Sequence, residues 1–152
     1  MIRLIAIAAL AVMLGTGAAR AGGVEGVWLT EKRKVAVELY PCGGAMCGKI
    51  VWLAKPRSRD GMLRRDVRNP DPALRDRPWC GIEVIRGLRR DGPGWADGHF
   101  YYPKEGKSFD IDLSDAGDGT LKVRAYLGIR LLGKTEVWTR PEGDLPGCEP
   151  DV

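Results

Sequence analysis

The sequence has little histidine and few aromatic residues. Its 152 residues include one His, and Phe, Trp and Tyr together make up 7%. Any Ser-His-Asp or Cys-His site would therefore have to use His99. Beyond the N-terminus, no stretch approaches the roughly 18 consecutive apolar residues that a membrane-spanning helix needs. The length is that of one domain, so a transporter, a multidomain enzyme and stable membrane insertion are all disfavoured.

The first 21 residues have the organisation of a secretory signal peptide. Arg3 gives a positive start, residues 4–14 form an apolar run, and Ala19 and Ala21 are small residues at the positions that signal peptidase reads. A buried or membrane helix is the alternative, but the run is short for a span. We expect cleavage near Ala21 and a periplasmic or secreted product of residues 22–152.

Charge is distributed unevenly along the predicted mature chain. Residues 22–152 carry 22 Lys and Arg against 20 Asp and Glu, a net charge of +2. Residues 55–90 hold 11 basic and 5 acidic residues, whereas residues 91–152 hold 7 and 12. Internal ion pairing on a solvated surface is the simpler interpretation, and a dedicated anion site is the alternative. The small net charge and the lack of aromatics among the arginines argue against a nucleic-acid partner.

The four cysteines are an even number in a chain that we expect to be exported, which predicts two disulfides in one of three connectivities. Cys42 and Cys47 flank a short loop between strand-like runs, so Cys42 with Cys47 is the preferred pair. The remaining pair, Cys80 with Cys148, would hold the Pro- and Gly-containing tail, residues 141–152, against the body. A metal or redox site is the alternative for these thiols.

Alternation of apolar and polar residues predicts short β-strands throughout the mature chain. The pattern is clearest in residues 35–40, 108–113 and 121–126. Turn residues separate further candidates, and no segment after the signal peptide has a helical period over three turns. The sequence predicts an all-β, eight-stranded antiparallel barrel as a single domain of residues 22–152, because closure removes exposed strand edges. The other five candidate strands are residues 26–30, 48–53, 81–88, 98–102 and 131–140.

The connection at residues 54–78, between the third and fourth strands, is far longer than a hairpin loop, which predicts a flap over one barrel end. Asp71 before Pro72 has the form of a helix cap, so residues 72–76 are expected to form one helical turn. Leu74 is expected to point inward. The arginines of the loop, Arg75 and Arg77, are expected to pair with Asp66 or Asp71.

The sequence does not support a metal or cofactor site. Cys42 and Cys47 are too far apart for a CxxC motif, and one His is too few for the usual zinc ligand sets. Residues 110–121 are rich in Asp but have Asp115 and Leu121 where a calcium-binding EF-hand needs Gly and Glu. The glycines at 43–44 and 92–94 do not precede helices, so they form no phosphate cradle. We expect no metal and no cofactor.

Catalysis is also disfavoured. Oxidation of all four cysteines would leave no thiol nucleophile, and His99 lies within a predicted strand. Carboxylates such as Asp66 and Asp71, with Tyr101, are the remaining candidates for acid–base chemistry, and a role as loop caps explains the two Asp residues more simply. We therefore expect that the protein is not an enzyme.

Two resemblances sharpen the fold prediction. Trp28 opens the first strand and Arg140 ends the last, which is similar to the lipocalin arrangement in which an Arg from the last strand stacks on a first-strand Trp. Nearly all of the mature chain resembles the bacterial exported domain-of-unknown-function family 2147. This resemblance implies a lipocalin-like β-barrel in the bacterial envelope, but no established reaction. The residues that carry it are Cys42–Gly43, Cys47–Val51, Asp66, Asn69–Pro72, Leu74–Arg75, Arg77–Pro78, Gly81, Trp95, Gly98, Tyr101, Pro103, Gly106–Lys107, Leu121–Gly128, Leu132–Gly133 and Trp138.

The chain departs from the family pattern at Cys80, where an aliphatic residue is usual, and at Ala125, where Gly is usual. The bridge from Cys80 to Cys148 therefore cannot be taken from the family.

Two functions follow as hypotheses. In the first, a small apolar or amphiphilic molecule binds at the barrel end covered by the flap. In the second, the barrel is filled, and the Arg-rich flap meets an anionic envelope component or a partner protein. The candidate ligand-binding residues combine tyrosines, flap polar groups and cations that could hold an acidic head group: Asn69, Asp71, Arg75, Arg77, Tyr101, Tyr102, Lys107 and Tyr126.

Overall fold

The computed structural model describes residues 23–148. The predicted signal peptide with its cleavage site and the last residues of the tail lie outside the described residues. Within 23–148, none of the helices is both long enough and apolar enough to span a membrane.

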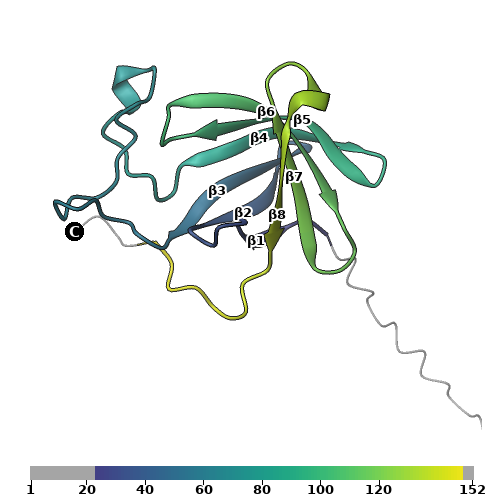
Figure 1. Cartoon of the computed structure of the whole chain (residues 1–152), viewed down its shortest axis with the longest axis horizontal. Helices are drawn as coiled ribbons and strands as arrows, with labels where there is room; N and C mark the ends of the chain where they lie inside the picture. Colours follow the sequence, from purple (N-terminus) through teal and green to yellow (C-terminus); the bar gives the residue numbers. More distant parts are fainter. Residues whose placement is uncertain (1–22, 149–152) are drawn as a thin grey trace, which may run out of the picture.

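Eight antiparallel strands follow one another around a closed barrel, so that the last strand pairs with the first (Figure 1). The predicted all-β barrel, with a long flap between the third and fourth strands, is thus confirmed. The strands are β1 (Gly26–Leu29), β2 (Val35–Cys42), β3 (Ala45–Leu53), β4 (Glu83–Asp91), β5 (Gly94–Tyr102), β6 (Lys107–Asp115), β7 (Thr120–Tyr126) and β8 (Lys134–Thr139).

Large apolar side chains fill the interior. The period-two pattern places every second residue of a strand inside, and these residues form one continuous cluster. Each side chain of this size contributes about 1.5–3 kcal/mol when fully buried, so the cluster is the main source of stability. None of the following members is more than 5% exposed: Trp28, Val37, Leu39, Met46, Ile50, Ile85, Leu88, Ile111, Leu113, Leu121, Val123 and Trp138.

The two ends of the barrel differ in their connections. Successive connections of an up-and-down barrel alternate between its ends, so the β1–β2, β3–β4, β5–β6 and β7–β8 connections share one end. We call this the mouth end. The other end, the closed end, has only the short β2–β3, β4–β5 and β6–β7 turns. The flap (residues 54–82) and the β7–β8 connection (residues 127–133) therefore both lie at the mouth end.

Two short 3-10 helices lie in these mouth-end connections. The flap contains η1 (Pro72–Leu74), which Asp71 caps by accepting a hydrogen bond from the Ala73 backbone at 3.0 Å. The helical turn predicted for this segment is confirmed, although it is shorter than residues 72–76. Leu74 is 37% exposed, so the prediction that it points inward is wrong. The turn is short and buries none of its residues.

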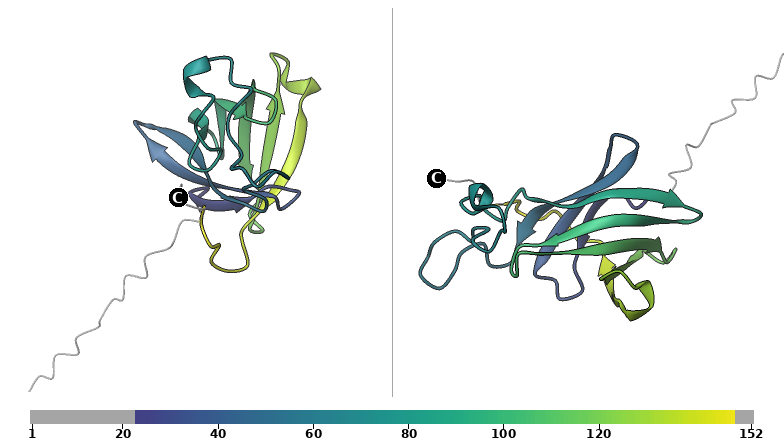
Figure 2. Two further views of the ribbon diagram at one scale, coloured as in Figure 1. Left: turned by 90° about the vertical axis from the view of Figure 1, so that its left-hand side faces the viewer. Right: turned by 90° about the horizontal axis from the view of Figure 1, so that it is seen from above.

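The strand predicted at residues 131–140 begins later than expected. Residues Arg130–Leu132 form the second 3-10 helix, η2, and β8 starts only at Lys134. Gly133 cannot carry a side chain here, because a Cβ would lie 2.6 Å from the carbonyl oxygen of Ala125. Figure 1 shows η1 in the flap at the upper left and η2 above β8 at the upper right, and both views of Figure 2 also show that the two helices lie apart.

The predicted clasp between the first and last strands is confirmed at the closed end. The Arg140 guanidinium lies 3.7 Å from the centre of the Trp28 ring, a cation–π contact. Arg140 also donates hydrogen bonds to the backbone carbonyls of Gly23, Glu25 and Val27. Burial lowers the pKa of Arg140. The clasp therefore holds the chain before β1 against the end of β8.

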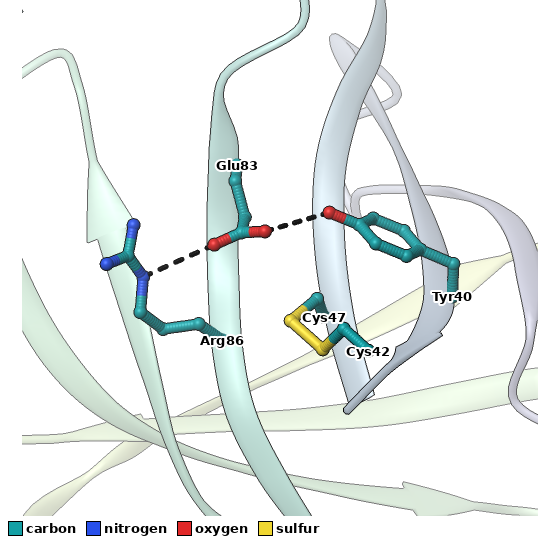
Figure 3. The surroundings of a disulfide bond; sticks show 5 residues. All are labelled: Tyr40, Cys42, Cys47, Glu83 and Arg86. Atoms are coloured by element: carbon teal, nitrogen blue, oxygen red, sulfur yellow. Dashed lines mark hydrogen bonds and ion pairs between the residues drawn. A yellow bond between two sulfur atoms is a disulfide. The ribbon is translucent and has the colours of Figure 1, made fainter. Parts of the chain in front are cut away.

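Both predicted disulfides are present, and they fasten different ends of the molecule. Cys42–Cys47 spans the β2–β3 turn at the closed end, and Cys80–Cys148 joins the C-terminal tail to the flap. Near the first disulfide, Tyr40 donates a hydrogen bond to Glu83 across β3 at 2.8 Å, and Glu83 also pairs with Arg86 (Figure 3). Burial and the Glu83 carboxylate raise the pKa of Tyr40.

Candidate functional site

The structure separates the predicted ligand-binding residues into three places. One group surrounds Asp66 at the base of the flap, a second lies at the barrel mouth, and Tyr126 lies on the outer face of β7. The group at the flap contains Asn69, Asp71, Arg75, Arg77 and Tyr101.

Asp66 is the centre of the first group and is completely buried. Its Oδ2 accepts hydrogen bonds from Asn69 Nδ2 at 2.7 Å and from the Arg77 guanidinium at 2.8 and 3.0 Å. The pairing of Asp66 with Arg77, one of those predicted, is therefore confirmed. The Tyr101 hydroxyl donates to Asp66 Oδ1 at 2.5 Å. These donors come from both the flap and β5, so the carboxylate fastens the flap to the barrel wall.

The Tyr101 hydroxyl keeps its proton in this group at ordinary pH. Burial and the hydrogen bond to Asp66 raise the pKa of Tyr101 to about 12. The Arg77 guanidinium also lies over the Tyr101 ring, 5.8 Å from its centre. Asp66 and Arg77 form an ion pair, so their opposite charges largely neutralise each other within the protein.

The remaining flap residues of this group stabilise the loop itself. Asn69 accepts a hydrogen bond from the Asp71 backbone at 2.9 Å, and its own carbonyl oxygen accepts one from Arg75 Nε at 2.8 Å. The β5–β6 turn supports the flap from below, since a Cβ at Gly106 would collide with the backbone carbonyl of Arg68. The polar side chains of Asn69 and Arg75 therefore hold the flap in its conformation.

The barrel mouth carries an aromatic lining. A side chain at Gly98 would lie 2.5 Å from Leu88, so Gly98 faces the interior, and Phe100 and Tyr102 face the same side two and four residues further along β5. Phe109 is the partner of Phe100 on β6. The Phe100 ring centre lies 6.3 Å from that of Tyr102 and 6.5 Å from that of Phe109, distances typical of interacting aromatic rings.

An acidic group from β8 reaches the same opening. Glu136 accepts a hydrogen bond from the buried Trp138 indole at 3.3 Å and pairs with Lys134 at 3.7 Å. Burial raises the pKa of Tyr102, and the negative charges of Glu105 and Glu136 raise it further. Because β6 and β7 separate β5 from β8 in the sheet, Tyr102 and Glu136 are close only across the barrel opening.

Lys107 lies at the rim of this mouth. It is opposite Tyr102 in the β5–β6 register, pairs with Glu105 at 3.2 Å, and its side chain is 65% exposed. Of the predicted residues, the structure thus brings Tyr102 and Lys107 together at the mouth.

Sequence reasoning missed Phe100, Phe109 and Glu136. The period of two after Gly98 could have placed Phe100 beside Tyr102, because both lie on one face of a strand. Nothing in the local sequence could have placed Glu136 near them, since their proximity results from closing the barrel.

Tyr126 does not belong to the mouth. Its hydroxyl lies 3.3 Å from Asp112, and the Arg130 guanidinium stacks over its ring at 5.6 Å. Burial is the largest cause that raises the pKa of Tyr126. Tyr126 therefore supports the β7–β8 connection from the outer wall.

A groove lies on the outer wall, away from the mouth. Its volume is about 710 Å³, and the tail after β8 forms one side of it. Val27, Glu38 and Val51 form the opposite side on three neighbouring strands. Glu38 is engaged by Lys49 at 3.1 Å.

The described residues offer little for metal or imidazole chemistry. Within residues 23–148, no group of three or more His, Cys, Asp or Glu side chains could hold a metal ion. His99 lies on the outside of the barrel, where its Nδ1 is 3.5 Å from Asp110 and its side chain is 66% exposed. The arrangement at the mouth is instead suited to contact with an apolar molecule that has a polar group.

Comparisons with known proteins agree with this architecture. The chain is similar to a solved structure described as protein HP1028 from the human pathogen Helicobacter pylori, which belongs to the lipocalin family. The two chains are 23% identical, the match covers 79% of this chain and 84% of the other, and the TM-score is 0.68. This likeness shows the lipocalin-like fold. No curated protein matches the chain. The model of the family described as uncharacterized proteins conserved in bacteria, DUF2147, matches residues 26–140, and the chain therefore belongs to this family.

Proposed function

We propose that the protein binds a small apolar or amphiphilic molecule at the barrel mouth, and that it takes no part in catalysis. The observation that supports this proposal is the gathering of Phe100, Tyr102 and Phe109 opposite Glu136 at the flap-bearing end. Aromatic rings beside a few placed polar groups are the usual composition of a small-molecule site.

The packed interior limits how deep such a ligand lies. Leu88, Ile111 and Trp138 are each at most 2% exposed, so the space beneath the aromatic rings is occupied by the protein's own side chains. The ligand in this proposal therefore lies across the mouth beside the flap. Its polar group would be a hydrogen-bond donor, because the partly exposed Glu136 carboxylate accepts hydrogen bonds.

The proposal includes export. An N-terminal segment with the features of a signal peptide precedes the barrel, and two disulfides join all four cysteines. Disulfides persist in oxidising compartments such as the periplasm and rarely in the cytosol. These features support a binding protein that acts outside the cytoplasm.

Titration with an apolar fluorophore tests the proposed site. N-phenyl-1-naphthylamine fluoresces on entering an apolar environment, and we expect Phe109→Ala to weaken its binding about tenfold, in line with the loss of one aromatic contact. Val137→Ala, on the outer face of β8, is the matched control and should bind as the unchanged protein does.

Native mass spectrometry of protein purified from its host should in addition reveal a bound small molecule. Equal fluorophore binding by the unchanged protein and Phe109→Ala, with both variants folded, would exclude the mouth as the binding site.

A further inference from the structure

The β7–β8 connection exposes four large aliphatic side chains. Leu127, Ile129, Leu131 and Leu132 are 69, 59, 87 and 79% exposed, and we call them the apolar tip. Single exposed aliphatic residues are common, but a contiguous group of this kind marks an interaction site. Among the described residues, the other exposed large apolar side chains lie in the flap or on β8, namely Met62, Val67, Leu74 and Val137.

The tip is held in place from below. The Arg124 guanidinium donates hydrogen bonds to the carbonyls of Arg130 and Leu131 at 2.9 and 3.0 Å and to Thr135 Oγ1 at 2.8 Å. Arg130 Nε pairs with Asp112 at 2.5 Å. The polar groups of the connection are thus used within the protein, while its aliphatic side chains project outward in a fixed arrangement.

The tip lies at the mouth end of the barrel, against its outer wall, where Arg130 pairs with Asp112. Gly133 alone separates it from β8, whose Glu136 reaches the barrel opening. An apolar surface at this end of the barrel would bring a poorly water-soluble ligand to the end that holds the opening.

The same end of the barrel is positively charged. Residues 54–82 contain eight Lys and Arg against four Asp, a net charge of +4. Lys55, Arg59 and Arg68 are exposed. Basic residues close to apolar side chains are the usual composition of a surface that binds an anionic bilayer.

We infer that the apolar tip inserts into the surface of an anionic lipid bilayer, with the flap against the lipid head groups. The mouth then faces the membrane and receives an amphiphile from it, which is the part of this inference that rests on the proposed function. A lipid surface fits better than a protein partner, because the tip is a projecting loop of aliphatic residues, whereas protein interfaces are enriched in aromatic residues.

Vesicle flotation tests the inference with the purified mature protein. We expect binding to phosphatidylcholine vesicles that contain about 30% phosphatidylglycerol and weaker binding to pure phosphatidylcholine, since flap cations are attracted to anionic head groups. The double variant Leu131→Ser/Leu132→Ser should bind at least about tenfold more weakly, because it removes apolar contacts with the bilayer. Ala116→Ser, in the closed-end β6–β7 turn, is the control and should bind normally.

Failure of the unchanged protein to float with anionic vesicles, or equal flotation of the double variant, would overturn the inference. Dimerisation that the double variant abolishes, without vesicle binding, would assign the tip to a second copy of the chain. The fluorophore separates the two proposals. If only the tip inference is wrong, Phe109→Ala still weakens fluorophore binding. If only the mouth proposal is wrong, vesicle binding persists and depends on the tip.

Discussion

The closed end and the mouth end of the barrel use similar residues for opposite purposes. At the closed end, Trp28 is 2% exposed and Arg140 covers it, so apolar surface and charge are combined within the protein. At the mouth end, Leu131 is 87% exposed while Arg124 beneath it is bonded to backbone carbonyls. The difference is that the closed end buries its apolar surface within the protein, whereas the mouth end leaves apolar surface exposed.

Replacing one apolar residue at each end should give the largest contrast. We expect Trp28→Ala to lower the free energy of unfolding by about 3–5 kcal/mol, because it leaves a cavity in the core and removes the cation–π contact with Arg140. Leu131→Ala should change it by less than about 0.5 kcal/mol, since the side chain is largely in water. Urea unfolding measures both variants, and comparable losses would contradict the proposed difference between the ends.

The two disulfides also allow the two ends to be compared, and we expect a smaller difference in the free energy of unfolding between them. Cys80–Cys148 has a sequence separation of 68 and Cys42–Cys47 one of 5. On the chain-entropy model, the first constrains the unfolded chain by about 4 kcal/mol and the second by about 2 kcal/mol. Urea unfolding of Cys80→Ser/Cys148→Ser should therefore show the larger loss. A larger loss in Cys42→Ser/Cys47→Ser would mean that local strain or packing, rather than chain entropy, decides the contribution of each disulfide.

Alkaline pH should loosen the mouth end through Tyr101. Its pKa rises from 10.0 to about 12 in the folded protein, so the protonated hydroxyl is favoured by folding. This stabilisation is complete below the unfolded pKa and is lost as the pH rises from about 10 through about 12. Tyr101→Phe should abolish this part of the pH dependence of unfolding.

The pKa values of Tyr40, Tyr102 and Tyr126 are also raised, so the difference between the unchanged protein and Tyr101→Phe isolates the flap contribution. An identical pH dependence in the two proteins would show that the Asp66 group does not depend on the Tyr101 proton.

Local sequence patterns were sufficient for most of the barrel. Alternation in residues 108–113 and 121–126 predicted β6 and β7, because a half-buried strand places successive side chains on opposite faces. The capped turn at Asp71 and the pairing of Cys42 with Cys47 also depend on residues close in sequence, and both were predicted. The start of β8 was missed because η2 uses the same apolar residues as a strand would.

The candidate site was predictable only in part. Tyr102 and Lys107 lie at the mouth, whereas Arg77 faces a buried carboxylate and Tyr126 lies outside the barrel. The sequence predicted that Arg77 would pair with a loop carboxylate and equally that it would contact a ligand, and its geometry supports the first role. No periodic pattern distinguishes an arginine that is used internally from one that is free.

The amino-acid sequence by itself determined the strands, the flap and the residues that clasp the two ends of the sheet, because these follow from residue type and spacing along the chain. Only the tertiary structure decided that Glu136 faces Tyr102 across the opening and that the leucines of the β7–β8 connection point into solvent. Both features depend on contacts between residues that are distant in sequence. Glu136 and Tyr102 approach each other only when the barrel closes, and Arg124 holds the β7–β8 connection by donating hydrogen bonds to its backbone carbonyls.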